Sequence, residues 1–336
     1  MVDLLRVEPR NSVYRLPGVI GMIAGLALYL PTLAFGAVAE PWNISFPTLG
    51  GKQVWQDTHI HAGWRIQRNL LTGHFRLLDP KDLRRAWGSY PRCAGKLDQF
   101  RDTGAVTPRN AHVVLLVHGI ARSAGTFRHM ESALLRAGYA ATAITYPSTR
   151  GSIADHAAAL ELILDRLEGA ETVSFVTHSM GALVVRHLMA RNGRWQRRIQ
   201  IGRAVMIAPP NQGSEIADRL KGNGLYRGLY GRAGQDLTPE QADTIPPYTH
   251  DFGIIAGGTG NQRGLNPLLD GDNDGIVSLD ETRLDGAADF LMVPGTHTFL
   301  AGRSETITAT LSFLRHGKFG APSENLNGAR PGRPEK

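Results

Sequence analysis

The sequence predicts an α/β protein whose core is a mostly parallel, doubly wound sheet over residues 111–317. The first reason is that continuous apolar runs such as residues 113–117 alternate with amphipathic segments such as residues 155–167. A strand covered on both faces is apolar throughout, and strands that alternate with helices form parallel sheets. The second reason is Ser179, where the β-branched pattern of residues 173–178 changes at once to apolar residues at helical spacing.

The individual elements follow from these patterns in chain order. We expect strands over residues 113–117, 140–146, 173–178, 204–208, 252–257 and 290–293. Helices are expected over residues 126–137 and 155–167, directly after Ser179, and over residues 304–315. Gly138, Pro147 and Pro209 end their segments because glycine and proline interrupt regular structure.

The composition is that of a globular protein with a full core. Of the 336 residues, 42% are hydrophobic, and the formal net charge is +7. The arginine excess is scattered, as in residues 191–198, so a solvated surface explains it better than a nucleic-acid site. Cys93 is the single cysteine, which excludes an internal disulfide framework and a cysteine-based metal site.

Residues 1–39 have the pattern of an export segment. Three arginines in residues 1–15 precede residues 16–39, which carry no charge and end in Ala-Val-Ala. A basic start, an apolar middle and a small-residue end make a signal peptide, and the uncharged run is also long enough to cross a bilayer. We therefore expect an exported protein, periplasmic or secreted, whose segment is either cleaved before Glu40 or retained as a membrane anchor.

Residues 40–110 form an N-terminal extension outside the regular pattern. Polar and apolar residues mix over residues 53–78, with a turn at residues 70–74, which predicts a small antiparallel β-hairpin. Residues 79–110 are expected to be a loop-rich linker with one short helix. At the other end of the chain, the polar composition of residues 318–336 predicts a disordered tail.

Two groups of side chains raise the question of a metal ion. Asp57, His59, His61 and His74 could be ligands, but they lack a zinc spacing, and we interpret them as surface residues of the hairpin. Residues 270–281 fit the calcium-loop pattern of three spaced aspartates, a glycine and a glutamate. Glycine and proline on both sides break the helices that such a loop requires. We expect no metal, with a structural calcium ion at residues 270–281 as the alternative.

The position of Ser179 suits a nucleophile. A serine on a sharp turn from strand to helix projects its hydroxyl outward, beside backbone amides and the positive end of the helix dipole. Residues 177–181 read Thr-His-Ser-Met-Gly, which departs from the usual Gly-x-Ser-x-Gly pattern at its first position. The alternative is an ordinary serine that caps a helix.

Candidates for a general base and its acidic partner follow later strands. The carboxyl ends of parallel strands meet at one edge of the sheet, where an acidic loop (residues 270–277) follows one strand and His297 follows the next. The order serine, acid, histidine is the one expected for this kind of sheet. His118 precedes the serine, and we interpret it as structural.

The same edge offers backbone donors for a developing negative charge. Gly119 allows a close turn after the first strand of the sheet, so that the Ile120 N–H can point at the substrate. The Met180 N–H, directly after Ser179, is the second donor. Two amides aimed at one point form an oxyanion hole.

Taken together, these motifs resemble the α/β-hydrolase superfamily and, within it, the bacterial serine lipases and esterases. The similarity covers about residues 111–316 and rests on four motifs, at residues 117–120, 178–181, 273–277 and 295–297. It implies Ser179 as nucleophile, Asp274 as acid and His297 as base. It also implies the amides of Ile120 and Met180 as the oxyanion hole.

Residues 211–250 interrupt the regular pattern and are expected to form a lid or cap. Leu225, Tyr226, Leu229 and Tyr230 recur at one-and-four spacing, so a short helix would place them on one face. We expect Leu225, Tyr226 and Leu229 to bind the substrate. The alternative is that they fill the core beneath the insertion.

The sequence thus predicts an exported serine hydrolase that cleaves carboxylic esters through an acyl-enzyme on Ser179. Its substrate would be a small-molecule or lipid ester, with association to a membrane, no cofactor and no nucleic-acid partner. The alternatives are an acyltransferase or thioesterase of the same fold, and a membrane-tethered binding module without catalysis.

Overall fold

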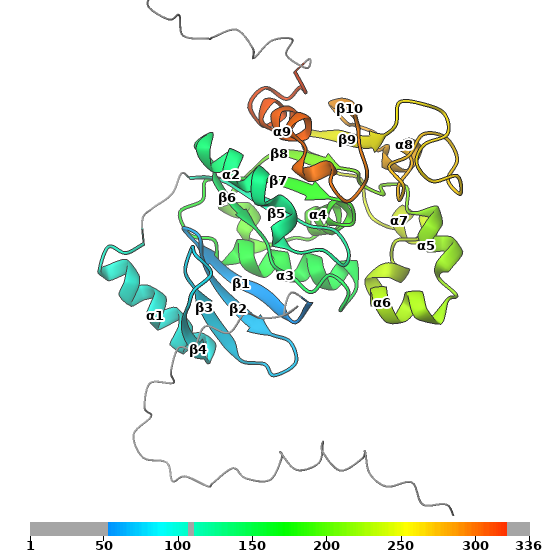
Figure 1. Ribbon diagram of the computed structural model, residues 1–336. Coiled ribbons are helices and arrows are strands. Elements are labelled where there is room, and N and C mark those ends of the chain that lie inside the picture. Colours follow the sequence, from blue (N-terminus) through cyan, green and yellow to red (C-terminus); the bar gives the residue numbers. More distant parts are fainter. Residues whose placement is uncertain (1–52, 107–110, 321–336) are drawn as a thin grey trace, which may run out of the picture. The chain divides into compact units, whose positions relative to one another are not determined.

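Six parallel strands form the main sheet, in the order β10-β9-β8-β7-β5-β6 (Figure 1). They are β5 (His112–Val117), β6 (Ala140–Ala143), β7 (Thr172–His178), β8 (Gln200–Ile207), β9 (Phe252–Gly258) and β10 (Asp289–Pro294). The structure is a computed structural model that describes residues 53–106 and 111–320. The predicted export segment and residues 321–336 of the predicted tail therefore lie outside the described residues. The prediction of a mostly parallel, doubly wound sheet is confirmed.

Helices cover both faces of this sheet. The helices that belong to it are α2 (Arg128–Arg136), α3 (Ile153–Asp165), α4 (Gly181–Met189), α8 (Leu279–Thr282) and α9 (Ser304–His316). Side chains of α3 and α4 pack in one buried cluster, and those of α2 and α9 pack in the other. Ser152 begins α3 with a reciprocal capping box to Asp155, and Gly317 ends α9 in the left-handed conformation that glycine tolerates best.

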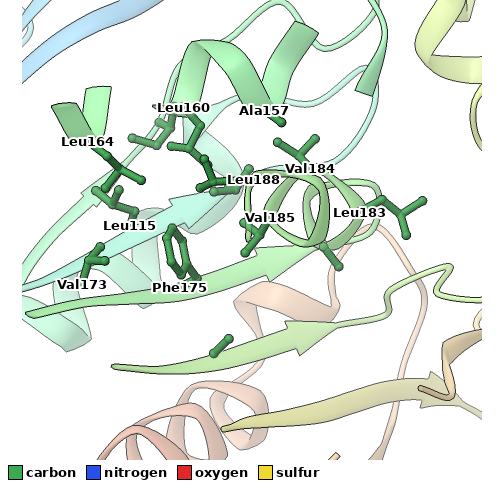
Figure 2. Packing of buried hydrophobic residues seen from close by; sticks show 14 of the residues in the cluster. Leu115, Ala157, Leu160, Leu164, Val173, Phe175, Leu183, Val184, Val185 and Leu188 are labelled. Atoms are coloured by element: carbon green, nitrogen blue, oxygen red, sulfur yellow. The ribbon is translucent and has the colours of Figure 1, made fainter. Parts of the chain in front are cut away.

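Alternate residues of each central strand explain why the apolar runs are continuous. Leu115 belongs to the cluster under α3 and α4, whereas its neighbour Leu116 belongs to the cluster under α2 and α9. Figure 2 shows Leu115 and Phe175 from the sheet against Leu160 of α3 and Leu188 of α4. Both faces of a strand are therefore buried, and each buried leucine stabilises the fold by about 2 kcal/mol.

The strand predicted over residues 140–146 is shorter in the structure, because β6 ends at Ala143. The reason is that Thr145 pairs with Asp57 of the N-terminal extension. The Asp57 N–H donates to the Thr145 carbonyl at 2.8 Å, and the Thr145 N–H donates to the Asp57 carboxylate at 2.6 Å. Ile144 still donates its N–H to the Leu116 carbonyl of β5, and the backbone leaves the main sheet at Thr145 to bind the N-terminal extension.

The N-terminal extension is larger than the predicted hairpin and linker. It is a four-stranded antiparallel sheet in the order β1-β2-β3-β4. Its elements are β1 (Trp55–His61), β2 (Trp64–Asn69), β3 (Phe75–Leu78), β4 (Arg84–Gly88) and the helix α1 (Tyr90–Asp102). Cys93 and Leu97 of α1 pack on Trp64, Ile66 and Leu77 of the sheet. The one helix expected in residues 79–110 is present as α1, but it is 13 residues long, and the strand β4 replaces part of the predicted loop-rich linker.

Three helices occupy the insertion at residues 211–250. They are α5 (Glu215–Leu220), α6 (Gly224–Gln235) and α7 (Pro239–Asp243). Asn223 caps α6 by accepting hydrogen bonds from the N–H groups of Leu225 and Tyr226. Gly231 interrupts α6 with φ of +58°, and a side chain there would lie 2.2 Å from the Thr149 carbonyl oxygen.

The start of the predicted tail is packed rather than disordered. The Phe319 ring lies 4.9 Å from the Phe313 ring of α9, and the Phe319 N–H donates to the Asp289 carboxylate at 2.8 Å. Across residues 53–106 and 111–320, none of the helices has the length and apolar character needed to span a bilayer.

Candidate active site

Ser179 occupies a strained turn between β7 and α4. Its φ is +54°, in the left-handed region that few residues other than glycine adopt. The Ser179 N–H donates to the Ile207 carbonyl at 2.9 Å, and the Ser179 carbonyl accepts from the Ala182 N–H at 3.0 Å. The turn is thus fixed from both sides. A strained serine between strand and helix is the backbone arrangement of a nucleophile.

Two glycines make this turn possible. A Cβ at Gly181 would lie 2.2 Å from the Val117 carbonyl oxygen, and one at Gly119 would lie 2.8 Å from the Ser179 Cβ. A side chain at Gly181 would therefore push α4 away from the end of β5, and one at Gly119 would push the loop after β5 away from Ser179. Thr177, at the place of the usual first glycine, is fully buried and is accommodated.

The predicted oxyanion donors lie on the two turns that meet at Gly119 and Ser179. Ile120 follows Gly119, and Met180 follows Ser179 at the start of α4. Within the described part of the chain, neither the Ile120 N–H nor the Met180 N–H donates a hydrogen bond to another residue. Both donors are therefore available to a substrate oxygen.

Asp274 and His297 form a buried pair. The His297 Nδ1 and the Asp274 Oδ2 are 2.7 Å apart, and both side chains are less than 10% exposed. The second carboxylate oxygen accepts the N–H groups of Ile276 and Val277 at 3.0 and 2.8 Å. With Nδ1–H donated to Asp274, the Nε2 of His297 is left as a proton acceptor.

The residue before the serine holds the histidine loop. The His178 Nε2–H donates to the His297 carbonyl at 2.9 Å, and the two rings lie 4.8 Å apart. Burial, followed by the neighbouring His297, keeps the pKa of His178 well below its ordinary value, so the ring is neutral. His178 thereby brings His297 to the turn of Ser179. Among the described residues no hydrogen bond joins the Ser179 hydroxyl to the His297 ring, and such bonds often tighten only when substrate binds.

His118 is buried and packed, which agrees with the structural role expected from its place before Ser179 in the chain. Its ring stacks on Tyr146 at 4.2 Å, and its Nδ1–H donates to the Gly119 carbonyl at 2.9 Å. Burial lowers the pKa of His118 to about 4. It is a neutral side chain that supports the loop of Ile120.

The other acidic residues of the 270–281 loop serve different parts of the backbone. Asp272 accepts from the Thr259 N–H and hydroxyl and from the Gly260 N–H. Partial burial acts to raise the pKa of Asp272, but these hydrogen bonds outweigh it and hold the pKa below its ordinary value. The Glu281 carboxylate accepts the N–H groups of Glu215 and Ser278.

The described residues contain no group of three or more acidic, histidine or cysteine side chains that could hold a metal ion. The carboxylates of the 270–281 loop point to separate partners rather than to one ion. In β1, a bulge between Asp57 and His59 breaks the predicted alternation. Asp57 is bound to Gln67 and Thr145, His59 lies 3.1 Å from the Tyr90 hydroxyl, and His74 packs on Trp55.

The predicted substrate-binding residues of α6 do not share one face. Leu225 and Leu229 are 73% and 60% exposed, whereas Tyr226 packs against the core and its hydroxyl donates to the Gly234 carbonyl. Leu225 and Leu229, four residues apart, lie on one side of the helix. Tyr226 and Tyr230 are also four residues apart, but each follows a leucine by one residue and therefore lies further around the helix. Across the described chain, no hydrogen bond or ring contact connects these residues to Ser179, Asp274 or His297. The expectation of a single face was therefore wrong.

Sequence reasoning missed His178 and Arg122 as parts of this site. His178 precedes Ser179 directly, and that adjacency was the available signal. Arg122, two residues after Ile120, donates from its side chain to the Thr298 hydroxyl at 2.6 Å. No sequence pattern connects residues so distant in the chain.

Residues 85–239 match the model of a domain of unknown function, DUF7379. No curated protein matches the sequence.

Similar solved structures include the mature lipase BlEst2 of Bacillus licheniformis, which is 20% identical with a TM-score of 0.49 over 61% of this chain and 91% of that one. A metagenomic carboxyl esterase is 18% identical with a TM-score of 0.46 over 57% and 67% of the two chains. The lipase of Staphylococcus hyicus is 15% identical with a TM-score of 0.43 over 62% and 95%. The strand order of the main sheet, the turn at Ser179 between β7 and α4, and an acid and a histidine after β9 and β10 give this chain the α/β-hydrolase fold.

Proposed function

We propose that this protein is a serine hydrolase that cleaves carboxylic esters, of the lipase and esterase type. The observation that carries the proposal is the buried Asp274–His297 pair, held beside the strained turn of Ser179 by His178. A structural role alone does not require a histidine with a carboxylate on Nδ1 and a free Nε2 near a serine on a strained turn. That constellation is the one used for nucleophilic acyl transfer.

The geometry supports a two-step reaction. The Ser179 hydroxyl attacks the ester carbonyl while the His297 Nε2 takes its proton, and the new oxyanion accepts the N–H groups of Ile120 and Met180. The protonated His297, stabilised by Asp274, then gives the proton to the leaving alcohol. Water attacks the acyl-enzyme in the second step, with His297 as base, and releases the acid and free Ser179.

The test is hydrolysis of a series of p-nitrophenyl esters, from acetate to palmitate, by the full chain. We expect release of nitrophenol by the wild type and only the uncatalysed background with Ser179→Ala. Equal rates for the two proteins would overturn the proposal. A preference for transfer to an added alcohol, or for thioesters, would identify an acyltransferase or a thioesterase of the same fold.

We also propose that the protein is exported and that a lipid or small-molecule ester outside the cytoplasm is its substrate. The support is the basic start and the uncharged residues 16–39 of the sequence. Amino-terminal sequencing of the protein from cells distinguishes the two forms. A start at Glu40 indicates cleavage, an intact start in the membrane fraction indicates an anchor, and the full-length chain in the cytosol contradicts both.

A further inference from the structure

The turn that carries Ile120 is strained and is closed by Arg122. The Arg122 N–H donates to the Gly119 carbonyl at 3.3 Å, which closes a four-residue turn. Ala121 occupies its third position with φ of +55°, where this type of turn favours glycine. A strained turn persists only where its surroundings hold it. The direction of the Ile120 N–H therefore depends on what holds Arg122.

The side chain of Arg122 reaches across the site to the loop of the general base. Its guanidinium donates to the Thr298 hydroxyl at 2.6 Å, one residue after His297. Arg122 has no acidic partner within salt-bridge distance among the described residues. Its charge also acts, after burial and His297, to lower the pKa of His178, which places the guanidinium close to the site.

The backbone of Arg122 is held from the N-terminal extension. The Gln53 side-chain amide donates to the Arg122 carbonyl at 3.0 Å, while its oxygen accepts the N–H and hydroxyl of Thr149 at 3.2 and 3.1 Å. Gln53 lies two residues before β1, the first strand of the antiparallel sheet. The extension thus contacts the turn of Ile120 and the loop after β6 through one side chain.

We propose that Arg122 is a positioning residue, which fixes the turn of Ile120 relative to the loop of His297, and that Gln53 anchors it to the N-terminal sheet. The inference rests on the proposed function. The oxyanion donor and the general base sit on loops 177 residues apart in the chain, counted from Ile120 to His297 (297 − 120). Arg122 and Thr298 join these loops directly. Loss of this contact should displace the Ile120 donor without altering the nucleophile.

The first experiment is a double-mutant cycle in the full chain with Arg122→Gln and Thr298→Val. Complete loss of one oxyanion donor costs about 10²- to 10³-fold in kcat, so displacement of the Ile120 donor should cost about tenfold with KM nearly unchanged. The double variant should lose no more than the larger single loss, because both changes break one contact. Arg122→Lys, which can still donate to Thr298, should recover most of the rate.

A second readout reports the oxyanion hole itself. A trifluoromethyl ketone that forms a tetrahedral adduct on Ser179 should bind less tightly to Arg122→Gln, by the same factor as kcat/KM falls. Gln53→Glu keeps the acceptor for Thr149 but cannot donate to the Arg122 carbonyl, and it should show a smaller loss of the same kind. Arg128→Gln on α2 and Gln99→Glu on α1 are exposed controls that should change neither quantity.

Three results would overturn the inference. The first is a kcat of Arg122→Gln within twofold of the wild type, and the second is additive losses in the double-mutant cycle. The third is a loss confined to KM for anionic esters, which would make Arg122 a substrate contact. If Arg122→Gln does not fold, Thr298→Val and Gln53→Glu give the same test. Ser179→Ala is measured alongside, since activity in that variant refutes the proposed function, whereas an inactive Ser179→Ala with an unaffected Arg122→Gln refutes only the positioning role.

Discussion

Side chains have opposite environments in two regions of the molecule. One region is the edge of the sheet that carries Asp274 and His297, and the other is the insertion that carries α6. At the sheet edge, the Asp274 carboxylate, the His297 Nδ1 and the His297 carbonyl all have partners and are buried. On α6, Leu225 and Leu229 are more than half exposed. Buried groups with complete hydrogen bonds have one geometry, whereas exposed apolar side chains can adapt to what they meet. The difference is consistent with the proposed chemistry at the edge, and we propose that the insertion influences only which substrate is bound.

Removing Ser179 or His297 should have the largest effect of any change in the molecule. Ser179→Ala and His297→Ala should each lower kcat by about 10⁴-fold or more, because nucleophile and base act as a unit. Steady-state kinetics on a p-nitrophenyl ester measure this, with circular dichroism as the control for folding. Retained activity in purified Ser179→Ala would place the chemistry elsewhere.

The two carboxylates of the acidic loop should differ in a way that the hydrogen bonds explain. Asp274→Asn should lower kcat by up to about 10⁴-fold, because the amide disturbs the tautomer of His297. Asp272→Asn should leave kcat within about threefold and cost about 1 kcal/mol of stability, because Asp272 binds only Thr259 and backbone N–H groups. Kinetics and chemical denaturation of both variants decide this, and a crippled Asp272→Asn would reverse the assignment.

The sequence predicted the main sheet well because its signals are local. Burial on both faces makes the central strands apolar throughout, and Ser179 lies at the junction of two periodicities in one stretch of chain. Ser179, Asp274 and His297 could be proposed because their order along the chain follows the order of the strands. One structural observation distinguishes Asp274 from Asp272 as the partner of the histidine, namely the 2.7 Å contact between Asp274 and His297.

Other features were beyond the sequence because they depend on long-range contacts. The end of β6 at Ala143 is set by Asp57, which is 88 positions from Thr145 in the chain. The helix α1 buries only Cys93 and Leu97, so its apolar face is too narrow to define the bounds of the short helix expected in this region. The orientation of α6 was left open by the sequence, because spacing defines a face but does not say which face meets the protein.

The role of the insertion is tested by its exposed leucines. Leu225→Ser with Leu229→Ser should raise KM for long-chain esters about fivefold, the equivalent of about 1 kcal/mol of apolar contact, and leave short-chain esters unchanged. Because both leucines are exposed, the melting temperature should not change. Leu71→Ser is the matched control, as it is 67% exposed on the turn between β2 and β3. Equal losses on short and long esters together with a lower melting temperature would show that the face is core.

The last prediction concerns stability as a function of pH rather than catalysis. Burial lowers the pKa of His156 to about 4, while an unfolded histidine titrates near pH 6.5. The unfolded state therefore binds the proton first, and the contribution of His156 to stability is lost progressively as pH falls from about 6.5 to about 4, at about 1.4 kcal/mol per pH unit. Denaturant titrations over this range should give a shallower pH dependence for His156→Phe than for the wild type. Identical slopes for His156→Phe and wild type would contradict a buried neutral His156.

The most direct measurement of the central claim is covalent labelling with a fluorophosphonate, followed by mass spectrometry of the peptides. Such a reagent reacts with a serine only where a base activates it and an oxyanion site accepts the product. The account predicts one labelled peptide, modified on Ser179, with no labelling in Ser179→Ala and strongly slowed labelling in His297→Ala. Labelling of another serine, or an unlabelled wild type that is folded, would contradict the assignment of Ser179 as nucleophile.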